Sequence, residues 1–350
     1  MAPASAASSS RALNAILPLI AAGQPYEAHQ KARTFASRYS KSGQYDTTID
    51  VLFQSARELL KVGQQGSGTD LASFLLEVYD SNGEEVNEES RGRLTQLIAL
   101  TGSEGAWRKT TIDKAVAWSA KHGLYPAGDP DLHHYVGELL YKEGAFDAAE
   151  PHLLAAGKRD SARLLAHMFA EWASATTGAT PGAFALHGII PYLQNGNILA
   201  ARTFITEFVS QITTIKPSLL SSLQPRPISV SKEGTIDDIV YTTDSVMNFS
   251  QLAVRTCQRA QGDQNKAMRE AWVRLCGTYQ SKSGLLAVRG VRKTLIDLAE
   301  LYFAIPPPRT QPANPMADML SAMLGGSASS SAPARRVLSP LPPSSSPGLD

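Results

Sequence analysis

The chain has 350 residues, of which 43% are hydrophobic and 19% charged, so it holds ample apolar side chains for a core. Its 33 Lys and Arg balance 32 Asp and Glu, which excludes a global field that would attract nucleic acid or anionic lipid. Cys257 and Cys276 are too few for a disulfide framework and lack metal-ligand spacing. No signal-peptide pattern and no apolar run of about 20 residues is present. We therefore expect a soluble, cytosolic (cytoplasmic) protein.

Helical periodicity dominates from about residue 11 to residue 304, after residues 1–10, which we expect to be disordered. One helix carries a continuous apolar stripe of Ile49, Leu52, Phe53, Ala56, Leu59 and Leu60. The helix before it carries a similar stripe of Ala28, Ala32, Phe35, Ala36 and Tyr39. Further helices are predicted at about 88–101, 107–122, 130–142, 146–156, 160–175, 183–194, 198–213, 246–260, 264–281 and 286–304.

A glycine recurs five residues before a small residue at the start of several predicted helices. The pairs are Gly23/Ala28, Gly43/Thr48, Gly144/Ala149, Gly196/Ala201 and Gly262/Ala267. Glycine can end one helix in the left-handed conformation, and the small residue lets the next helix pack closely. The intervals are irregular, unlike those of a regular tetratricopeptide array. We predict an all-α fold, a right-handed α-solenoid of tetratricopeptide-like helix pairs; an irregular all-α globule is the alternative.

Residues 66–70, Gly-Ser-Gly-Thr-Asp, look like a glycine-rich corner between two helices. A phosphate-binding loop would need Gly-Lys-Ser/Thr after its glycines and a strand before it, and the sequence has neither. We expect Thr69 or Asp70 to cap the next helix instead.

One segment breaks the helical pattern, because β-branched residues alternate on both sides of residues 232–234, Lys-Glu-Gly. We predict a β-hairpin over 228–243, inserted in the C-terminal half; a disordered loop is the alternative. A lone hairpin is marginally stable in water, so it must pack on the solenoid or be completed by a partner.

The helical region divides into an N-terminal half, residues 11–156, and a C-terminal half, residues 157–305. Residues 306–350 are rich in Pro and Ser and are predicted to form a disordered tail. Within this tail, residues 316–324 place Met and Leu at helical spacing, which suits docking into a groove or folding back on the last helix.

No sequence pattern predicts catalysis, a cofactor or a metal site. His133 and His134 are adjacent, so on a helix they point about 100° apart and cannot chelate one ion together. The sequence has no His-Glu-x-x-His, Cys-x-x-Cys or Gly-x-Ser-x-Gly motif. Cys257 and Cys276 lie in apolar helices, where buried inert thiols are expected. We expect a protein that is not an enzyme and needs no cofactor.

The second predicted helix carries a local excess of positive charge. It contains four cationic residues, Lys31, Arg33, Arg38 and Lys41, and only one carboxylate, Glu27. His29 lies one helical turn before Arg33. Such a face could dock an acidic partner rapidly and with strong salt dependence. An ordinary solvated face is the alternative, and RNA binding is disfavoured because no aromatic platform accompanies the charge.

Several motifs together resemble the family of the fourth protein of the guided entry of tail-anchored proteins (Golgi-to-ER traffic) pathway. They are residues 26–30 (Tyr-Glu-Ala-His-Gln), 66–71 (Gly-Ser-Gly-Thr-Asp-Leu), 75–80 (Leu-Leu-Glu-Val-Tyr-Asp), 128–130 (Gly-Asp-Pro), 138–140 (Glu-Leu-Leu), 248–252 (Asn-Phe-Ser-Gln-Leu) and 316–326. The resemblance spans roughly residues 11–326. Members of this family are cytosolic α-solenoid adaptors for the delivery of tail-anchored membrane proteins.

The resemblance implies a non-enzymatic adaptor in the insertion of tail-anchored proteins into the ER. The N-terminal half would dock the dimeric targeting ATPase transiently, and the C-terminal half would hold a ubiquitin-like-domain protein as a permanent subunit. That subunit would attract a client-loaded co-chaperone, with no contact to nucleic acid and no direct membrane insertion. The ATPase-docking candidates are His29, Arg33, Arg38, Lys41, Lys61 and Asp70. The candidates for the ubiquitin-like partner are Ile228, Val230, Ile239, Val240, Tyr241, Phe249 and Leu252.

A generic tetratricopeptide-like co-chaperone or peptide-binding scaffold is the alternative function. It would need Lys or Arg and Asn side chains that converge in a groove to hold a terminal carboxylate. The sequence shows no such set.

Overall fold

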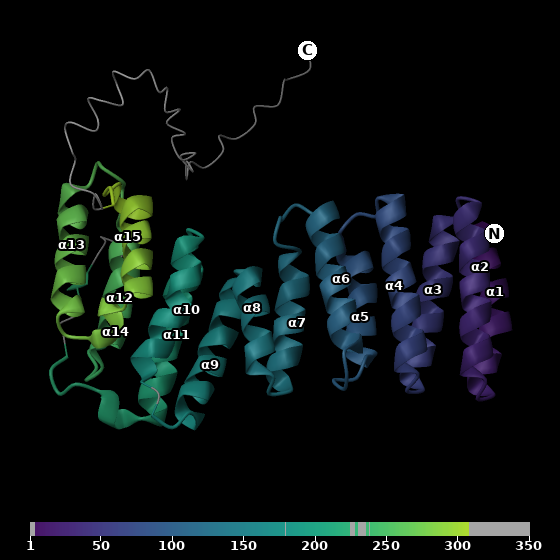
Figure 1. Cartoon of the computed structure of the whole chain (residues 1–350), viewed down its shortest axis with the longest axis horizontal. Helices are drawn as coiled ribbons and strands as arrows, with labels where there is room; N and C mark the ends of the chain where they lie inside the picture. Colours follow the sequence, from purple (N-terminus) through teal and green to yellow (C-terminus); the bar gives the residue numbers. More distant parts are fainter. Residues whose placement is uncertain (1–3, 179, 225–227, 230–235, 238, 308–350) are drawn as a thin grey trace, which may run out of the picture. The chain divides into compact units, whose positions relative to one another are not determined.

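The chain folds into helices joined by short turns (Figure 1). The computed structural model describes residues 4–178, 180–224, 228–229, 236–237 and 239–307. The helices in these ranges are α1 (Ala4–Ala21), α2 (Pro25–Lys41), α3 (Tyr45–Lys61), α4 (Gln65–Asn82), α5 (Glu88–Leu100), α6 (Trp107–His122), α7 (Pro130–Lys142), α8 (Phe146–Ala156), α9 (Arg159–Ala175), α10 (Pro181–Gln194), α11 (Ile198–Ile215), η1 (Pro217–Leu219), α12 (Ser245–Gln258), α13 (Lys266–Gln280), α14 (Gly284–Ala287) and α15 (Arg289–Phe303).

The helix boundaries predicted from the sequence between residues 88 and 281 agree with the structure to within about two residues. The first and the last segments of the helical region differ from the prediction. Residues 1–10 are predicted to be disordered, but α1 begins at Ala4. The helix predicted over 286–304 is divided into α14 and α15, because Val288 adopts an extended conformation with φ −58° and ψ 135°.

The glycine turns predicted from the sequence are confirmed. Gly23 and Gly43 lie in the left-handed region with φ of 74° and 73°. The amide of the next residue then donates to the carbonyl five positions earlier; the Gln44 N to Tyr39 O distance is 2.9 Å. Gly63, with φ 78°, is a further copy that the sequence pattern above omits, although it follows Gly43 by the same interval that separates Gly43 from Gly23.

The structure corrects the prediction that residues 66–70 form a corner. These residues lie in the first turns of α4, and the turn itself is at Gly63, with Gln64 at the N-cap. Neither Thr69 nor Asp70 therefore caps the helix. Gly68 serves packing, because a Cβ at this position would lie 2.5 Å from Leu60 Cδ2, so its absence lets α4 approach α3 closely.

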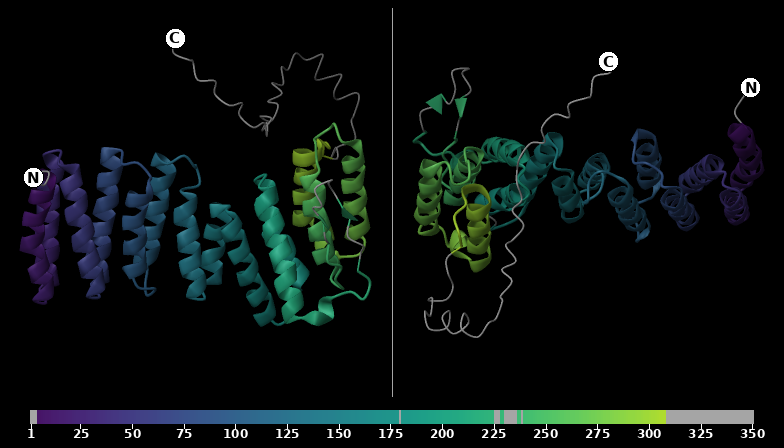
Figure 2. Two further views of the ribbon diagram at one scale, coloured as in Figure 1. Left: turned by 180° about the vertical axis from the view of Figure 1, so that it is seen from behind. Right: turned by 90° about the horizontal axis from the view of Figure 1, so that it is seen from above.

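The helices pack in two layers, with α2, α4 and α6 side by side in one and α1, α3, α5 and α7 in the other (Figure 2). Buried apolar side chains form two clusters, within residues 12–136 and 149–303, which meet at α7 and α8. This helical stack agrees with the predicted solenoid; its right-handed sense and the separate roles of its halves stay predictions. Within the described ranges, no helix has the length and apolar character required to cross a membrane.

The hairpin predicted over 228–243 is not found at that extent. Two strands of two residues each, β1 (Ile228–Ser229) and β2 (Ile236–Asp237), pair antiparallel with Ile228 opposite Asp237 (Figure 2). Residues 239–241 follow β2 outside any strand, and Thr242 makes an isolated bridge to Leu220. Val230 and the predicted tail segment 316–324 lie outside the described residues. A ladder this short supplies few backbone bonds of its own.

Candidate protein-docking sites

Three of the six residues predicted to dock the ATPase come together between α2 and α4. His29 Nε2 donates a hydrogen bond to Asp70 Oδ2 at 2.7 Å, and Arg33 Nη1 donates to the same oxygen. The Arg33 guanidinium also lies 5.5 Å from the centroid of the Phe74 ring. His29 and Arg33 are one turn apart on α2, and Asp70 and Phe74 are one turn apart on α4, so two neighbouring turns face each other. We call these four residues the α2–α4 cluster.

The α2–α4 cluster leaves much of its charge at the surface. The side chains of Arg33 and Asp70 are 45% and 42% exposed, whereas that of His29 is 13% exposed. Partial burial opposes ionisation of the Asp70 carboxyl, but the hydrogen bonds and charges of His29 and Arg33 outweigh it and hold the pKa of Asp70 below its ordinary value. Asp70 is therefore a carboxylate at neutral pH, and the cluster presents a compact arrangement of charges to a partner.

The other three candidates lie outside this cluster. Arg38 and Lys41 are exposed on α2, about 7 and 12 Å further along the helix axis than Arg33. Lys61, at the end of α3, donates to Glu58 Oε1 at 2.8 Å within its own helix. The structure thus places Arg38 and Lys41 on the same helix as the cluster but gives Lys61 a local partner of its own.

A second cluster on the same layer was not foreseen from the sequence. Asp80, at the other end of α4, accepts hydrogen bonds from His122 Nε2 at 2.7 Å and from Lys121 Nζ, both on α6. The hydrogen bonds from His122 and Lys121 lower the pKa of Asp80. Asp70 and Asp80 are ten residues apart, so they point about 80° apart and reach opposite neighbours of α4. That spacing is a signal which could have located the second cluster.

The segment that follows β2 is attached to the helices by glutamine side chains. Val240 N donates to Gln251 Oε1 at 3.0 Å, and Gln251 Nε2 donates to Val240 O at 2.8 Å. Tyr241 N donates to Gln224 Oε1 at 3.1 Å, and Gln224 Nε2 donates to Tyr241 O at 2.9 Å. Each glutamine pairs with both backbone groups of one residue, as a neighbouring strand would. Together with the backbone hydrogen bonds to residues 219–221, these glutamines give the segment a fixed course although it is not part of a strand.

A groove of about 350 Å³ lies beside this segment. The groove is lined by residues of α11, of the connection between α11 and α12, and of α12. They are Ile205, Thr206, Val209, Ser210, Thr213, Thr214, Leu220, Val240, Gln251 and Arg255. Leu220, which lines the groove, is 45% exposed, and Tyr241, the neighbour of the lining residue Val240, is 36% exposed.

The predicted candidates for the ubiquitin-like partner divide around this groove. Val240 lines it, while Ile239 is half-buried and Tyr241 is exposed beside it. Phe249 is wrong as a contact residue, because its ring is fully buried and packs 5.8 Å from the Tyr279 ring. Leu252 is half-buried on α12. No sequence pattern indicates the roles of Gln224 and Gln251, whose partners lie 17 and 11 residues away.

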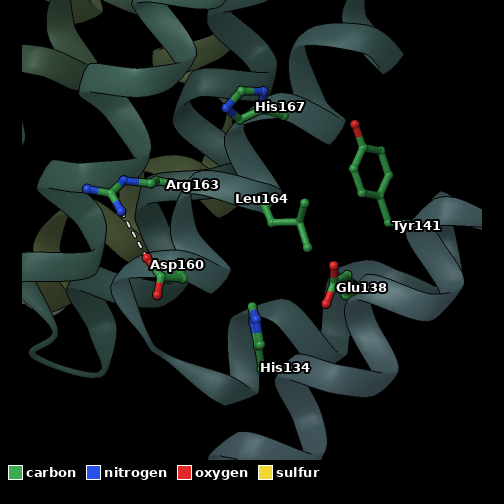
Figure 3. Close-up of a pocket in the computed structure, with 7 residues that line it drawn as sticks. All are labelled: His134, Glu138, Tyr141, Asp160, Arg163, Leu164 and His167. Atoms are coloured by element: carbon green, nitrogen blue, oxygen red, sulfur yellow. Dashed lines mark hydrogen bonds and ion pairs between the residues drawn. The ribbon is translucent and has the colours of Figure 1, made fainter.

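A further pocket, of about 270 Å³, lies between α7 and α9 and contains none of the predicted site residues (Figure 3). Its lining residues are His134, Glu138, Tyr141, Asp160, Arg163, Leu164 and His167. Arg163 pairs with Asp160 at 2.9 Å, and Tyr141 donates to Glu171 at 2.7 Å. The lining residues include no Ser, Cys or Lys.

The residues that the structure describes were also compared with the requirements of a metal site and of a reactive cysteine. In those residues no three His, Cys, Asp or Glu side chains are placed to hold a metal ion. Burial raises the pKa of Cys276 to about 12 and raises that of Cys257 as well. Both thiols are therefore protonated at neutral pH and poor nucleophiles.

The chain matches known proteins over most of its length. A family profile described as "Golgi to ER traffic protein 4" matches residues 42–324. The protein of that name from Aspergillus fumigatus is 32% identical over 320 residues, 88% of this chain and 87% of the relative. The Schizosaccharomyces pombe protein is 28% identical over 302 residues, 86% of this chain and 91% of the relative. A solved structure titled "Crystal structure of C. therm. Get4" matches with a TM-score of 0.75 and 31% identity, over 95% of this chain and 99% of that one. The chain belongs to the Golgi to ER traffic protein 4 family.

Proposed function

We propose that this chain is a non-enzymatic adaptor of the cytosol in the post-translational insertion of tail-anchored proteins into the ER. Its N-terminal half docks the dimeric targeting ATPase transiently, and its C-terminal half holds a ubiquitin-like-domain protein, which brings a client-loaded co-chaperone. Membership of the Golgi to ER traffic protein 4 family supports the pathway. The observation that carries the docking proposal is the α2–α4 cluster, which fixes the exposed Arg33 guanidinium beside the His29 imidazole.

The two candidate sites differ as the two proposed partners require. The cationic face of α2 is exposed and charged, which favours fast and reversible association. The groove beside Val240 is bordered by exposed apolar side chains on a segment fixed by Gln224 and Gln251, which favours a lasting, largely apolar interface. A transient partner therefore belongs to the first site and a permanent one to the second.

The ATPase site is tested by reversing charge on α2. We expect Arg33→Glu with Arg38→Glu to abolish binding of the purified ATPase in a direct binding assay, because two attractive charges become repulsive. Lys109→Glu with Lys114→Glu makes the same charge change on exposed positions of α6 and serves as the matched control. Undiminished ATPase binding by the α2 variant, or equal loss in the control, would contradict the assignment.

The ubiquitin-like site is tested by placing a charge in the groove. Val240→Asp is expected to weaken binding of the purified ubiquitin-like protein by at least about tenfold, because the new carboxylate would lose water on binding. Val273→Asp on α13 is the control, since Val273 is 59% exposed and does not line the groove. Unchanged affinity of the Val240→Asp variant would place the partner elsewhere.

A further inference from the structure

Asp70 is predicted from the sequence as a residue that meets the ATPase, but its contacts in the structure lie within the chain. The His29 imidazole and the Arg33 guanidinium of the α2–α4 cluster are both directed at one atom of it, Oδ2. These two donors are on α2 and the carboxylate is on α4, so the pairing joins two helices of the same layer. In the free protein, therefore, His29 and Arg33 already have a carboxylate partner.

An acidic group of an approaching partner would meet two opposing effects at this point. Arg33 attracts it, while the Asp70 carboxylate repels it and already accepts the hydrogen bonds of both Arg33 and His29. The carboxylate is 42% exposed and the guanidinium 45% exposed, so water screens their attraction. Ion pairs with this exposure contribute little to the stability of a fold. The pairing is therefore weak enough to be exchanged on docking.

We propose that Asp70 is an internal counter-ion that competes with the acidic partner for His29 and Arg33, so that docking exchanges one ion pair for another. This inference rests on the proposed docking of the ATPase at α2. Asp70 thus keeps the affinity of the site for an acidic partner below the value that Arg33 and His29 would give without it. Such a restraint suits a partner that has to leave in each cycle of delivery.

The chain supplies a matched control for this idea. Asp80 lies on the same helix, is 46% exposed, and accepts from one imidazole and one permanent cation, as Asp70 does. Its partners are on α6, and it is ten residues away from Asp70. Asp70→Asn and Asp80→Asn remove the same charge from the same helix and keep the side-chain shape. Only Asp70→Asn removes the carboxylate that pairs with Arg33 and His29 of α2.

The test is the equilibrium affinity of the purified ATPase for the full chain and its variants at low salt. We expect Asp70→Asn to bind about two- to fivefold more tightly than the unmodified chain, and Asp80→Asn to change the affinity by a smaller factor. In an Arg33→Gln background, Asp70→Asn should lose most of its effect, because the main competing cation is gone. Thermal unfolding of each variant checks that the fold is intact.

Weaker or unchanged binding by Asp70→Asn, or equal gains from both Asn variants, would overturn the proposal. These results differ from a failure of the proposed function. If the unmodified chain does not bind the ATPase, or if Arg33→Glu with Arg38→Glu binds as well as the unmodified chain, the docking site itself is wrong. If the charge reversal abolishes binding and Asp70→Asn does not strengthen it, only the counter-ion role fails.

Discussion

The α2–α4 cluster and the groove beside Val240 are held in place by different interactions. In the cluster, charged side chains of two long helices pair with one another at the surface. At the groove, glutamine side chains bind the backbone of a segment that is not part of a strand. The first arrangement responds to salt and to charge substitution, whereas the second responds to the loss of neutral hydrogen bonds. The two sites can therefore be separated by experiment.

The largest expected effect is at the groove. Gln251→Ala would leave the backbone N–H and C=O of Val240 without their partners, and each unpaired group costs about 1–3 kcal/mol. We expect affinity for the ubiquitin-like protein to fall by about 100-fold, measured by calorimetry, with ATPase binding unchanged. Gln258→Ala is the control, because Gln258 is an exposed residue at the end of the same helix. Equal affinities of the two variants would show that the segment does not form the site.

The next effect tests the packing beneath the ATPase face. Gly68→Ala would put a Cβ 2.5 Å from Leu60 Cδ2 and force α3 and α4 apart, so we expect the free energy of unfolding to fall by about 2 kcal/mol. Gly66→Ala, two residues away, would place its Cβ 3.7 Å from the Trp107 ring, an ordinary contact. Chemical denaturation should therefore distinguish the two variants. If both are equally stable, the close approach of these helices is not required.

A third prediction concerns pH and the joint between the two core clusters, where the His133 and His152 Nδ1 atoms are 2.9 Å apart. Burial, the neighbouring His133 and, more weakly, Lys109 lower the pKa of His152 to about 4, and only Asp113 opposes this shift. The unfolded chain, with a pKa near 6.5, then binds a proton that the folded chain does not, so stability falls as pH drops from 6.5 to 4.

We expect this proton to contribute about 1–2 kcal/mol of the acid destabilisation, since His152 keeps some contact with solvent. The measurement is the free energy of unfolding against pH for the unmodified chain and for His152→Asn. The variant should show a smaller slope between pH 6.5 and 4. The same slope in both proteins would contradict the assignment.

The smallest expected effect is at Lys61. Because Glu58 already pairs with Lys61, and also with Arg57, Lys61→Ala should change ATPase affinity by less than about twofold. Arg33→Ala, measured in the same assay, should have a clearly larger effect because Arg33 belongs to the α2–α4 cluster. A larger effect of Lys61→Ala than of Arg33→Ala would move the docking site toward the end of α3.

The sequence predicted the α2–α4 cluster better than the groove, for a physical reason. His29 and Arg33 are one turn apart on a long helix, so periodicity alone places them on one face. The groove depends on Gln224 and Gln251, which meet backbone groups across irregular chain, and no local pattern reports such contacts. Phe249 was misplaced because an apolar residue on an amphipathic helix suits the core and a partner surface equally well in sequence.

At residues 63–70, too, a local sequence pattern did not predict the structure. Gly, Ser, Thr and Asp favour turns, so their run at 66–70 predicts a corner. The structure instead continues α4 through them, because Gly63 already makes the turn and Gly68 fits against Leu60. Tertiary packing here overrides local preference. Comparing Gly63 with Gly23 and Gly43, at equal intervals, would have located the turn from the sequence.

The most direct test of the two-site account is the affinity of the full chain for each purified partner at about 50 and 200 mM salt. Screening weakens exposed ion pairs far more than apolar contacts and neutral hydrogen bonds. We predict that affinity for the ATPase falls by about tenfold or more over this range, while affinity for the ubiquitin-like protein changes by less than about twofold. Equal salt dependence of the two affinities, or an ATPase affinity that does not respond to salt, would contradict the account.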